Sequence, residues 1–296
     1  MTLLGHAIDY AGLFPPAALD MESAVRKYHV HRNQPESWML GRFVVPVSRL
    51  EDFNFAALDV LDGGRGEPQW KLAALVADDF RADMDRIQRF NEWHREKRED
   101  GLAVIDVVEA KADTTKFVEA AAAIVPDGIE CFFEIPITDD PTVLVEVISS
   151  ARAGAKVRTG GVTPDMFPLA SDLARLLKIC HEKDVVLKAT AGLHHPLCGV
   201  KNLTYEPGSP TGRMYGFLNL LIAAAGASEL MSDGEIIEAL EEEDVTAFAF
   251  DELGVRWKGR FFSNDVLESV RTRSVSAFGS CSFDEPIEDL KGLRLL

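Results

Sequence analysis

The chain of 296 residues contains few cysteines and no apolar stretch long enough to cross a membrane. Its four cysteines (Cys131, Cys180, Cys198 and Cys281) are scattered without C-x-x-C spacing, so we expect reduced thiols in a cytoplasmic protein. No apolar run approaches the roughly 18 residues that a membrane helix needs. The first nine residues do not combine a basic region, an apolar segment and a small-residue cleavage site, so we expect no signal peptide.

Basic residues are also outnumbered by acidic ones: the chain has 31 Lys and Arg, 48 Asp and Glu, and a formal net charge of −17. Nucleic acid and anionic membranes repel such a protein, so we predict neither as a partner. No Gly-x-Gly-x-x-Gly or phosphate-loop motif follows a predicted strand, and we therefore predict no nucleotide cofactor. An anionic metabolite would have to be held by a local cluster of basic side chains.

The chain instead contains a regular alternation of apolar strands and amphipathic helices. The predicted strands are Leu4–Gly12, Arg42–Val47, Trp70–Ala77, Ala103–Lys111, Glu130–Pro136, Lys156–Thr159, Val185–Ala191 and Val275–Cys281. Eight strands that alternate with helices within one domain's length predict an α/β fold, a single (β/α)8 TIM barrel over residues 1–296. A doubly wound open sheet is the chief alternative.

The alternation is interrupted after the seventh strand, and we interpret residues 196–263 as an insertion with helices and a hairpin. Its predicted parts are a loop at Cys198–Pro210, helices at Met214–Ala225 and from the capping box Ser232–Glu235, and hairpin arms at Thr246–Phe250 and Gly254–Lys258. The segment Thr246–Phe250 is the main rival of Val275–Cys281 for the eighth strand.

Charged and polar residues lie within or directly after these strands. The candidates are Asp9, Glu109, Lys111, Glu134, Lys156, Arg158, Lys188, Thr190, His194, His195 and Ser280. In TIM barrels the active site lies at the carboxyl ends of the strands. Strand interiors are usually apolar, and a buried charge persists when it is paired or when function demands it. These residues therefore predict a site at one rim of the barrel.

Each candidate also has a structural interpretation. Glu109 and Lys111 fit an internal ion pair as well as catalysis, and Ser280 fits an ordinary turn better than a phosphate site. His194 and His195 are neighbours in an extended segment, so at most one of them is expected to face the pocket. Lys188 lies four residues into an apolar strand, where we favour a functional role.

Two strands resemble those of deoxyribose-phosphate aldolase. Leu187-Lys-Ala-Thr-Ala-Gly-Leu193 is similar to the Val-Lys-Ala-Ser-Gly-Gly-Ile run of that family's seventh strand. Ala155-Lys-Val-Arg-Thr-Gly160 more loosely resembles its sixth-strand Ile-Lys-Thr-Ser-Thr-Gly. The resemblance implies that Lys156 forms an imine with the substrate and that Lys188 lies beside it and lowers its pKa.

In this chain Arg158 stands two residues after Lys156, where that pattern has a serine. We therefore favour Lys188 over Lys156 as the nucleophile. The chain as a whole, with Asp9-Tyr-Ala-Gly-Leu-Phe-Pro-Pro16 and Ala191-Gly-Leu-His-His-Pro196, resembles a bacterial TIM-barrel family without an assigned activity.

We expect a carbon–carbon lyase of the aldolase-like, Schiff-base type that acts on a small anionic oxygenated metabolite without a metal or other cofactor. A lysine flanked by cations in a dry barrel would lose its proton readily and act as a nucleophile. Glu109 and Glu134 are the expected proton carriers. The expected substrate contacts are Arg158, Thr190, His194, His195, Asp9, Lys111 and Ser280.

Two alternatives stay open. One is a metal-dependent lyase or hydrolase at the same rim, with Asp9, Glu109, Glu134 and one histidine as ligands, although no His-x-His or His-Glu-x-x-His spacing supports it. The other is a non-catalytic barrel that binds a small anion or forms a homo-oligomer. Its interface would use Phe217–Ala225 with Phe248, Phe250 and Trp257, which we interpret instead as the core of the insertion.

Overall fold

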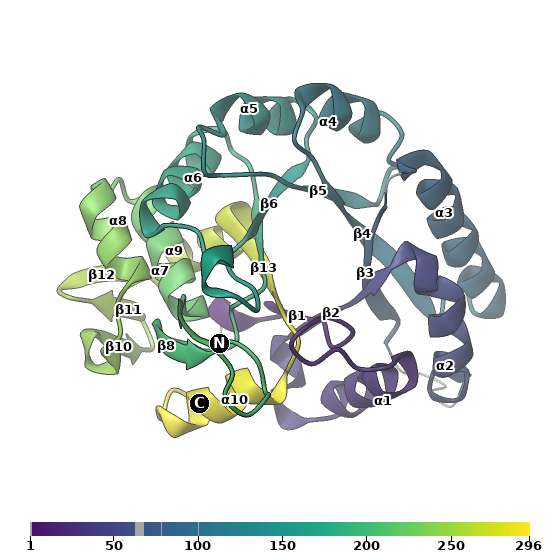
Figure 1. The fold of residues 1–296 in the computed structure, drawn as a ribbon, viewed down its shortest axis with the longest axis horizontal. Coiled ribbons are helices and arrows are strands. Elements are labelled where there is room, and N and C mark those ends of the chain that lie inside the picture. Colours follow the sequence, from purple (N-terminus) through teal and green to yellow (C-terminus); the bar gives the residue numbers. More distant parts are fainter. Residues whose placement is uncertain (1, 63–67, 78, 100) are drawn as a thin grey trace.

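Eight parallel strands close into a barrel in the computed structural model, which describes residues 2–62, 68–77, 79–99 and 101–296 (Figure 1). The strands are β1 (Ile8–Tyr10), β2 (Leu40–Pro46), β3 (Trp70–Leu75), β4 (Ala103–Lys111), β5 (Glu130–Glu134), β6 (Gly154–Arg158), β7 (Leu187–Thr190) and β13 (Val275–Ser280). Around the barrel their order is β1-β13-β7-β6-β5-β4-β3-β2. The predicted (β/α)8 TIM barrel is confirmed, and the open sheet is excluded because β1 pairs with both β2 and β13.

Helices surround the barrel and cover its outer face (Figure 1). They are α1 (Met21–Arg32), α2 (Leu50–Asp62), α3 (Phe80–Lys97), α4 (Thr115–Ala122), α5 (Thr142–Ser150), α6 (Ala170–Glu182), α7 (Phe217–Ser228) and α10 (Asp284–Gly292). In α3, Phe80, Met84, Ile87 and Phe90 recur at helical spacing and are all buried. Burying such a side chain stabilises the fold by ~1.5–3 kcal/mol, and the Asp79 carboxylate caps the helix by accepting from the Ala82 amide.

The segment between β7 and β13 holds two small antiparallel sheets. β8 (Gly199–Asn202) pairs with β9 (Thr211–Met214), so much of the predicted loop Cys198–Pro210 is a hairpin. β10 (Phe248–Asp251), β11 (Gly254–Trp257) and β12 (Arg260–Ser263) form a sheet of three strands rather than the predicted hairpin of two. Thr246–Phe250 therefore contributes to this sheet and not to the barrel.

Two further helices lie in this part of the chain, and the first begins as the sequence predicts. α8 (Asp233–Leu240) starts with the capping box of Ser232 and Glu235. α9 (Asn264–Ser269) is capped by Ser263 and continues into a π-helical turn, Val270–Ser274, that leads to β13. Within the described residues, no helix is both long and apolar enough to cross a membrane.

Helix α7 belongs to the barrel itself, although the predicted insertion 196–263 includes it. It packs against α6 and β13, and the Phe217 ring stacks on Phe278 of β13 with 5.0 Å between centroids. All its residues from Phe217 to Ala227 are buried, so this segment cannot serve as an interface between copies. Phe248 and Trp257 are also buried, and only Phe250 of the predicted interface aromatics is exposed, at 41%.

Candidate active site

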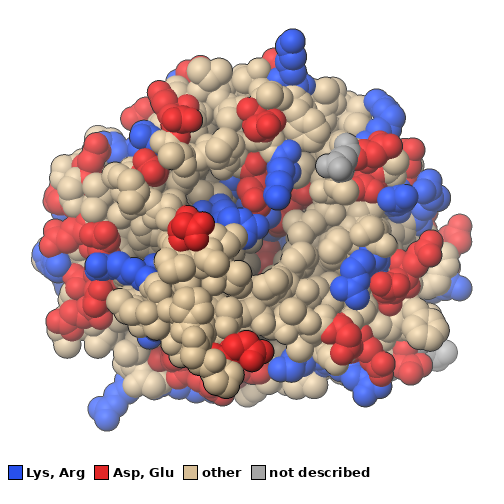
Figure 2. All heavy atoms as spheres, in the orientation of Figure 1, with Lys and Arg blue, Asp and Glu red and all other residues tan. Residues whose placement is uncertain are grey.

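A cavity of about 610 Å³ opens at the carboxyl ends of the barrel strands. Figure 2 shows it as a hollow near the centre of this face, with Lys and Arg atoms at its upper edge and acidic atoms deeper inside. Its volume lies within the ~300–1,000 Å³ typical of pockets for small molecules. The predicted rim is therefore the hollowed face of the barrel.

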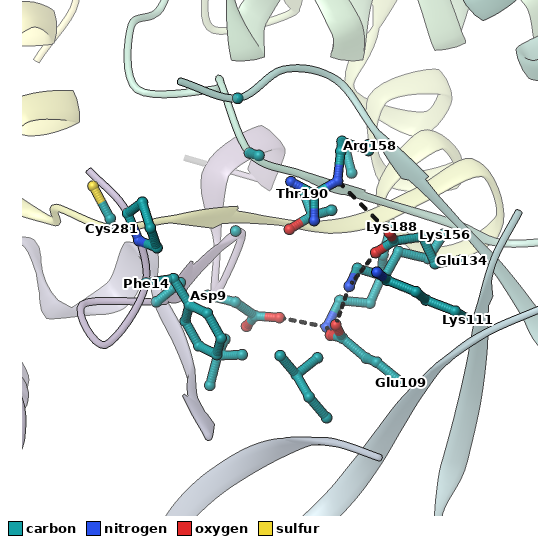
Figure 3. A pocket seen from close by; sticks show the side chains of 18 of the residues that line it. Asp9, Phe14, Glu109, Lys111, Glu134, Lys156, Arg158, Lys188, Thr190 and Cys281 are labelled. Atoms are coloured by element: carbon teal, nitrogen blue, oxygen red, sulfur yellow. Dashed lines mark hydrogen bonds and ion pairs between the residues drawn. The ribbon is translucent and has the colours of Figure 1, made fainter. Parts of the chain in front are cut away.

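The floor of the cavity is a chain of alternating charges (Figure 3). Glu109 of β4 bridges two lysines: its Oε1 lies 2.6 Å from Lys188 Nζ, and its Oε2 lies 2.8 Å from Lys156 Nζ. Asp9 of β1 extends the chain at one end, 2.6 Å from Lys188 Nζ. Glu134 of β5 extends it at the other end, 2.8 Å from Lys156 Nζ.

Strand register places these groups together. Lys156 and Lys188 are direct partners on β6 and β7, and Glu134 is the partner of Lys156 on β5. Side chains of neighbouring strands in register point to the same face, so all of them project into the barrel. Lys156 and Lys188 therefore lie at the same height, so the register does not favour Lys188 over Lys156 as the nucleophile.

The expectation that a lysine of this site loses its proton readily is wrong, because carboxylates surround both Lys156 and Lys188. Burial alone lowers the pKa of Lys188, but Asp9 and Glu109 outweigh it and raise the pKa above its ordinary value. The pKa of Lys156 is likewise raised by Glu109 and Glu134 against the effect of burial. Both amines are ammonium groups at neutral pH, because the nearest neighbours of each lysine are carboxylates and not the other lysine.

The carboxylates are shifted in the opposite direction. Burial alone raises the pKa of Glu109, but the two ammonium groups hold it at about 2. The pKa of Glu134 is also lowered, because Lys156 and Arg158 together outweigh its burial. Glu109 is thus paired with Lys156 and Lys188 and not with Lys111, so the interpretation of Glu109 and Lys111 as an internal ion pair is wrong.

This buried network is a weak source of stability. Replacing a buried ion pair by apolar side chains of similar volume is often neutral or stabilising, by ~1–4 kcal/mol. Asp9, Glu109 and Lys188 are almost inaccessible to solvent, yet they line an open cavity. Burying these charges costs free energy, and they lie where a ligand can reach them. We therefore interpret the network as part of a functional site.

A second layer lies above the floor, toward the mouth. Lys111, Arg158 and Thr190 follow Glu109, Lys156 and Lys188 by two residues on the same strands and line the same cavity. The side chain of Arg158 is 43% exposed, and its Nε lies 3.7 Å from Glu134 Oε1. This layer presents its cations to the solvent-accessible part of the cavity.

The two histidines diverge, as the sequence predicts. His194 is buried and lines the cavity, whereas His195 turns to α10, where its Nδ1 lies 2.6 Å from Asp289 Oδ2. Ser280 lies behind His194, with 3.2 Å between Ser280 Oγ and His194 Nδ1, and its hydroxyl donates to the Ser282 carbonyl. His195 and Ser280 are therefore outside the cavity lining and not the predicted direct contacts.

His194 faces the cavity as a neutral ring. Burial lowers its pKa to about 4, and the adjacent His195 acts in the same direction. Because the Ser280 hydroxyl already donates to Ser282, His194 Nδ1 is the donor toward Ser280 Oγ. The other ring nitrogen is then an acceptor.

Sequence reasoning missed the apolar wall of the cavity. Its residues are Phe14, Val44, Leu75, Val76, Phe117 and Met166, from β2, β3, the first turn of α4 and the loops at the mouth. Cys281, directly after β13, also lines the cavity. The run Phe14-Pro15-Pro16 in the loop after β1 is a signal that could have placed Phe14 at the rim, since loops after barrel strands build the site.

The ligand set of the metal-dependent alternative is not assembled. Asp9, Glu109 and Glu134 each face an ammonium group, and His194 faces Ser280. Across the described ranges, no three His, Cys, Asp or Glu side chains gather in an arrangement that could hold a metal ion. The geometry therefore does not favour this alternative.

No family model matches the chain, and the search of curated proteins finds no match either. The resemblance to deoxyribose-phosphate aldolase stays a prediction, and any functional conclusion depends on the geometry of the site.

Proposed function

We propose that the protein is a carbon–carbon lyase of the Schiff-base type, in which a buried lysine forms an imine with a carbonyl substrate. The observation that supports it is the sharing of Glu109 by Lys156 and Lys188 at the floor of an open cavity. A lysine with an adjacent base is the arrangement that this chemistry requires. The four cysteines are free and buried, which fits the reduced thiols of a cytoplasmic enzyme.

Lys156 is the better imine former. The Nζ atom of Lys188 lies 2.6 Å from an oxygen of each of two carboxylates and 5.4 Å from the centre of the Phe132 ring. Lys156 has longer contacts of 2.8 Å, and its partner Glu134 is shared with Arg158. Less electrostatic stabilisation must be given up when Lys156 loses its proton, so Lys188 is assigned the role of a fixed cation.

The first half of the reaction forms the imine. Lys156 passes a proton to Glu134 and attacks the carbonyl carbon of the substrate. A proton moves from nitrogen to oxygen, and the hydroxyl group of this adduct leaves as water with the proton held by Glu134. A protonated imine is left on Lys156, and Glu134 is again a carboxylate.

The second half breaks the carbon–carbon bond. Glu134 removes the proton from a hydroxyl group on the β-carbon, the bond between the α- and β-carbons breaks, and an aldehyde leaves. The electron pair of that bond becomes the enamine, and Glu134 returns its proton to the α-carbon. Water then hydrolyses the imine to the second carbonyl product and the Lys156 ammonium.

Substrate binding assists the first proton transfer. Arg158 lowers the pKa of Glu134, together with Lys156. An anionic group of the substrate bound to Arg158 counters the positive charge of the guanidinium and raises the proton affinity of Glu134. The acceptor thus becomes stronger when Lys156 must give up its proton.

Borohydride trapping tests the proposal. The protein is incubated with a panel of aldehydes, ketones and oxo acids, reduced, and analysed by intact mass. We expect one covalent adduct that is lost in Lys156→Ala and kept in Lys116→Ala, a matched change of an exposed lysine on α4. An adduct lost only in Lys188→Ala would exchange the two lysine roles, and no adduct across the panel would contradict the lyase.

A further inference from the structure

The charged residues that line the cavity do not balance. Among the described residues of the lining, the cations are Lys111, Lys156, Arg158 and Lys188, and the anions are Asp9, Glu109 and Glu134. His194 is neutral at pH 7. Four cations against three carboxylates leave one positive charge in a protein whose net charge is −17. A ligand with a single negative charge would neutralise the cavity.

The unmatched charge lies in the upper layer. Lys156 and Lys188 are enclosed by the three carboxylates of the floor, whereas Arg158 reaches Glu134 only at 3.7 Å. Lys111 is exposed and makes no ion pair with any described residue. Figure 3 shows Arg158 and Lys111 on the two sides of Glu134. Lys111 and the exposed part of the Arg158 guanidinium can therefore hold an anionic group at this edge.

The opposite side of the cavity is apolar. Phe14 lies across the cavity from Arg158 in Figure 3, and Val44, Leu75 and Val76 continue this side along β2 and β3. These side chains offer no partner for the hydroxyl groups of a sugar. Buried hydroxyl groups without a hydrogen-bond partner are costly, so the wall favours a hydrocarbon body.

The corner next to β13 is acidic, which disfavours a phosphate there. TIM barrels often bind phosphate near the loops after their seventh and eighth strands, at a helix N-terminus. Here α10 begins with Asp284 and Glu285, and Glu285 Oε2 lies 3.8 Å from His194 Nδ1. Glu285 Oε2 also accepts a hydrogen bond from the Tyr205 hydroxyl. These carboxylates would repel a dianion at that corner.

We propose that the site takes a monocarboxylate with an aliphatic or aromatic body, an oxo acid in the reaction, and not a phosphorylated sugar. Arg158 binds the carboxylate with its planar fork, Lys111 adds a second cation, and the body packs on the wall of Phe14, Val44 and Leu75. The oxo group rests on the proposed lyase function. The preference for a carboxylate with an apolar body does not.

Titration calorimetry with probes that carry no ketone or aldehyde separates the two claims. The probes are butanoate, pentanoate, hexanoate, hexanamide, 3-phenylpropanoate and phenyl phosphate, each titrated into the full chain. Arg158→Met and Lys111→Met remove the cations, Arg158→Lys restores a charge without the planar fork, and Lys116→Met is the control for an exposed lysine. Unfolding midpoints of all variants verify that they are folded.

We expect hexanoate to bind about tenfold more tightly than hexanamide or more, because a charge-assisted contact is lost in the amide. Affinity should rise about fourfold per methylene from butanoate to hexanoate, and 3-phenylpropanoate should bind more tightly than phenyl phosphate. Arg158→Met should weaken hexanoate about tenfold, Arg158→Lys less, and Lys116→Met not at all. Lys111→Met should weaken it by a smaller factor.

Equal binding of hexanoate and hexanamide, or tighter binding of phenyl phosphate than of 3-phenylpropanoate, would overturn the inference. Both comparisons use the unaltered protein, so they do not depend on a variant that folds. If hexanoate binds as expected but 2-oxohexanoate gives no borohydride adduct, the lyase fails and the ligand class stands. If an adduct forms without the carboxylate preference, the inference fails and the lyase stands.

Discussion

Lys156 and Lys188 are direct partners on β6 and β7, and their ammonium groups share the two oxygens of one carboxylate, Glu109. Glu109 lies between the two ammonium groups and forms an ion pair with each of them. Asp9 and Glu134 continue the alternation on either side. This relationship keeps both lysines protonated, because carboxylates raise the pKa of each one.

Glu109→Gln should destabilise the protein by about 3–5 kcal/mol, because it leaves two buried ammonium groups with one partner fewer. The measurement is the free energy of unfolding in urea at pH 7. Glu96→Gln, at an exposed position on α3, is the matched control and should change it by about 0.5 kcal/mol or less. A change in Glu109→Gln as small as in the control would show that the network contributes nothing.

The same variant should alter the acid limb of the stability curve. The pKa of Glu109 is lowered from 4.5 to about 2 in the folded protein, so the unfolded state binds the proton first. Its contribution is present above pH 4.5 and is lost as the pH falls to about 2. The difference in unfolding free energy between wild type and Glu109→Gln should therefore shrink over that range. A constant difference would contradict the assignment.

Glu134→Gln should change how the rate of imine formation depends on pH. In the wild type the Lys156 proton moves to Glu134 within the site, so the rate of borohydride-trapped adduct formation should be flat from about pH 6 to 9. In the variant the proton must leave to solvent, since Glu109 is held ionised by two ammonium groups. The rate should then be lower at pH 7 and rise about tenfold per pH unit, because the fraction of free amine does so below its pKa.

A wild-type rate that also rises tenfold per unit would contradict proton transfer to Glu134. Glu146→Gln, a change of an exposed carboxylate on α5, is the control and should keep the flat profile.

His194 should make stability sensitive to mild acid. Its pKa is lowered from 6.5 to about 4 by burial, so the unfolded state takes up a proton that the folded state refuses. This contribution is complete above pH 6.5 and is lost as the pH falls toward 4. Unfolding free energies of wild type and His194→Asn, measured from pH 7 to 4, should converge over that interval. Parallel curves would mean that His194 takes up its proton as readily in the folded state as in the unfolded state.

Phe217→Ala tests whether α7 is a helix of the barrel. The Phe217 ring is fully buried against Phe278, so its loss should leave a cavity and cost about 3–5 kcal/mol of unfolding free energy. Phe55→Ala, which changes a side chain 83% exposed on α2, should cost about 0.5 kcal/mol or less. Similar costs for both variants would mean that α7 is not part of the barrel core.

The alternation of strands and helices, and the positions of charges at strand ends, could be predicted from the sequence. Both depend on local periodicity, because side chains repeat every 2.0 residues on a strand and every 3.6 on a helix. The boundaries of β4 agree with the prediction, and β1 is shorter than predicted, since the chain turns at His6 with a positive φ of 51°. The capping box at Ser232 could be predicted for the same local reason.

Which charges meet could not be read from the sequence. Glu109 and Lys188 are separated by 79 positions, and their contact depends on the register of strands that pair only when the barrel closes. From the sequence we expected a lysine flanked by other cations. In the closed barrel, the carboxylate of Glu109 lies between the ammonium groups of Lys156 and Lys188. A pKa depends on distances of a few ångströms, so the raised pKa values of both lysines were decided by the tertiary structure alone.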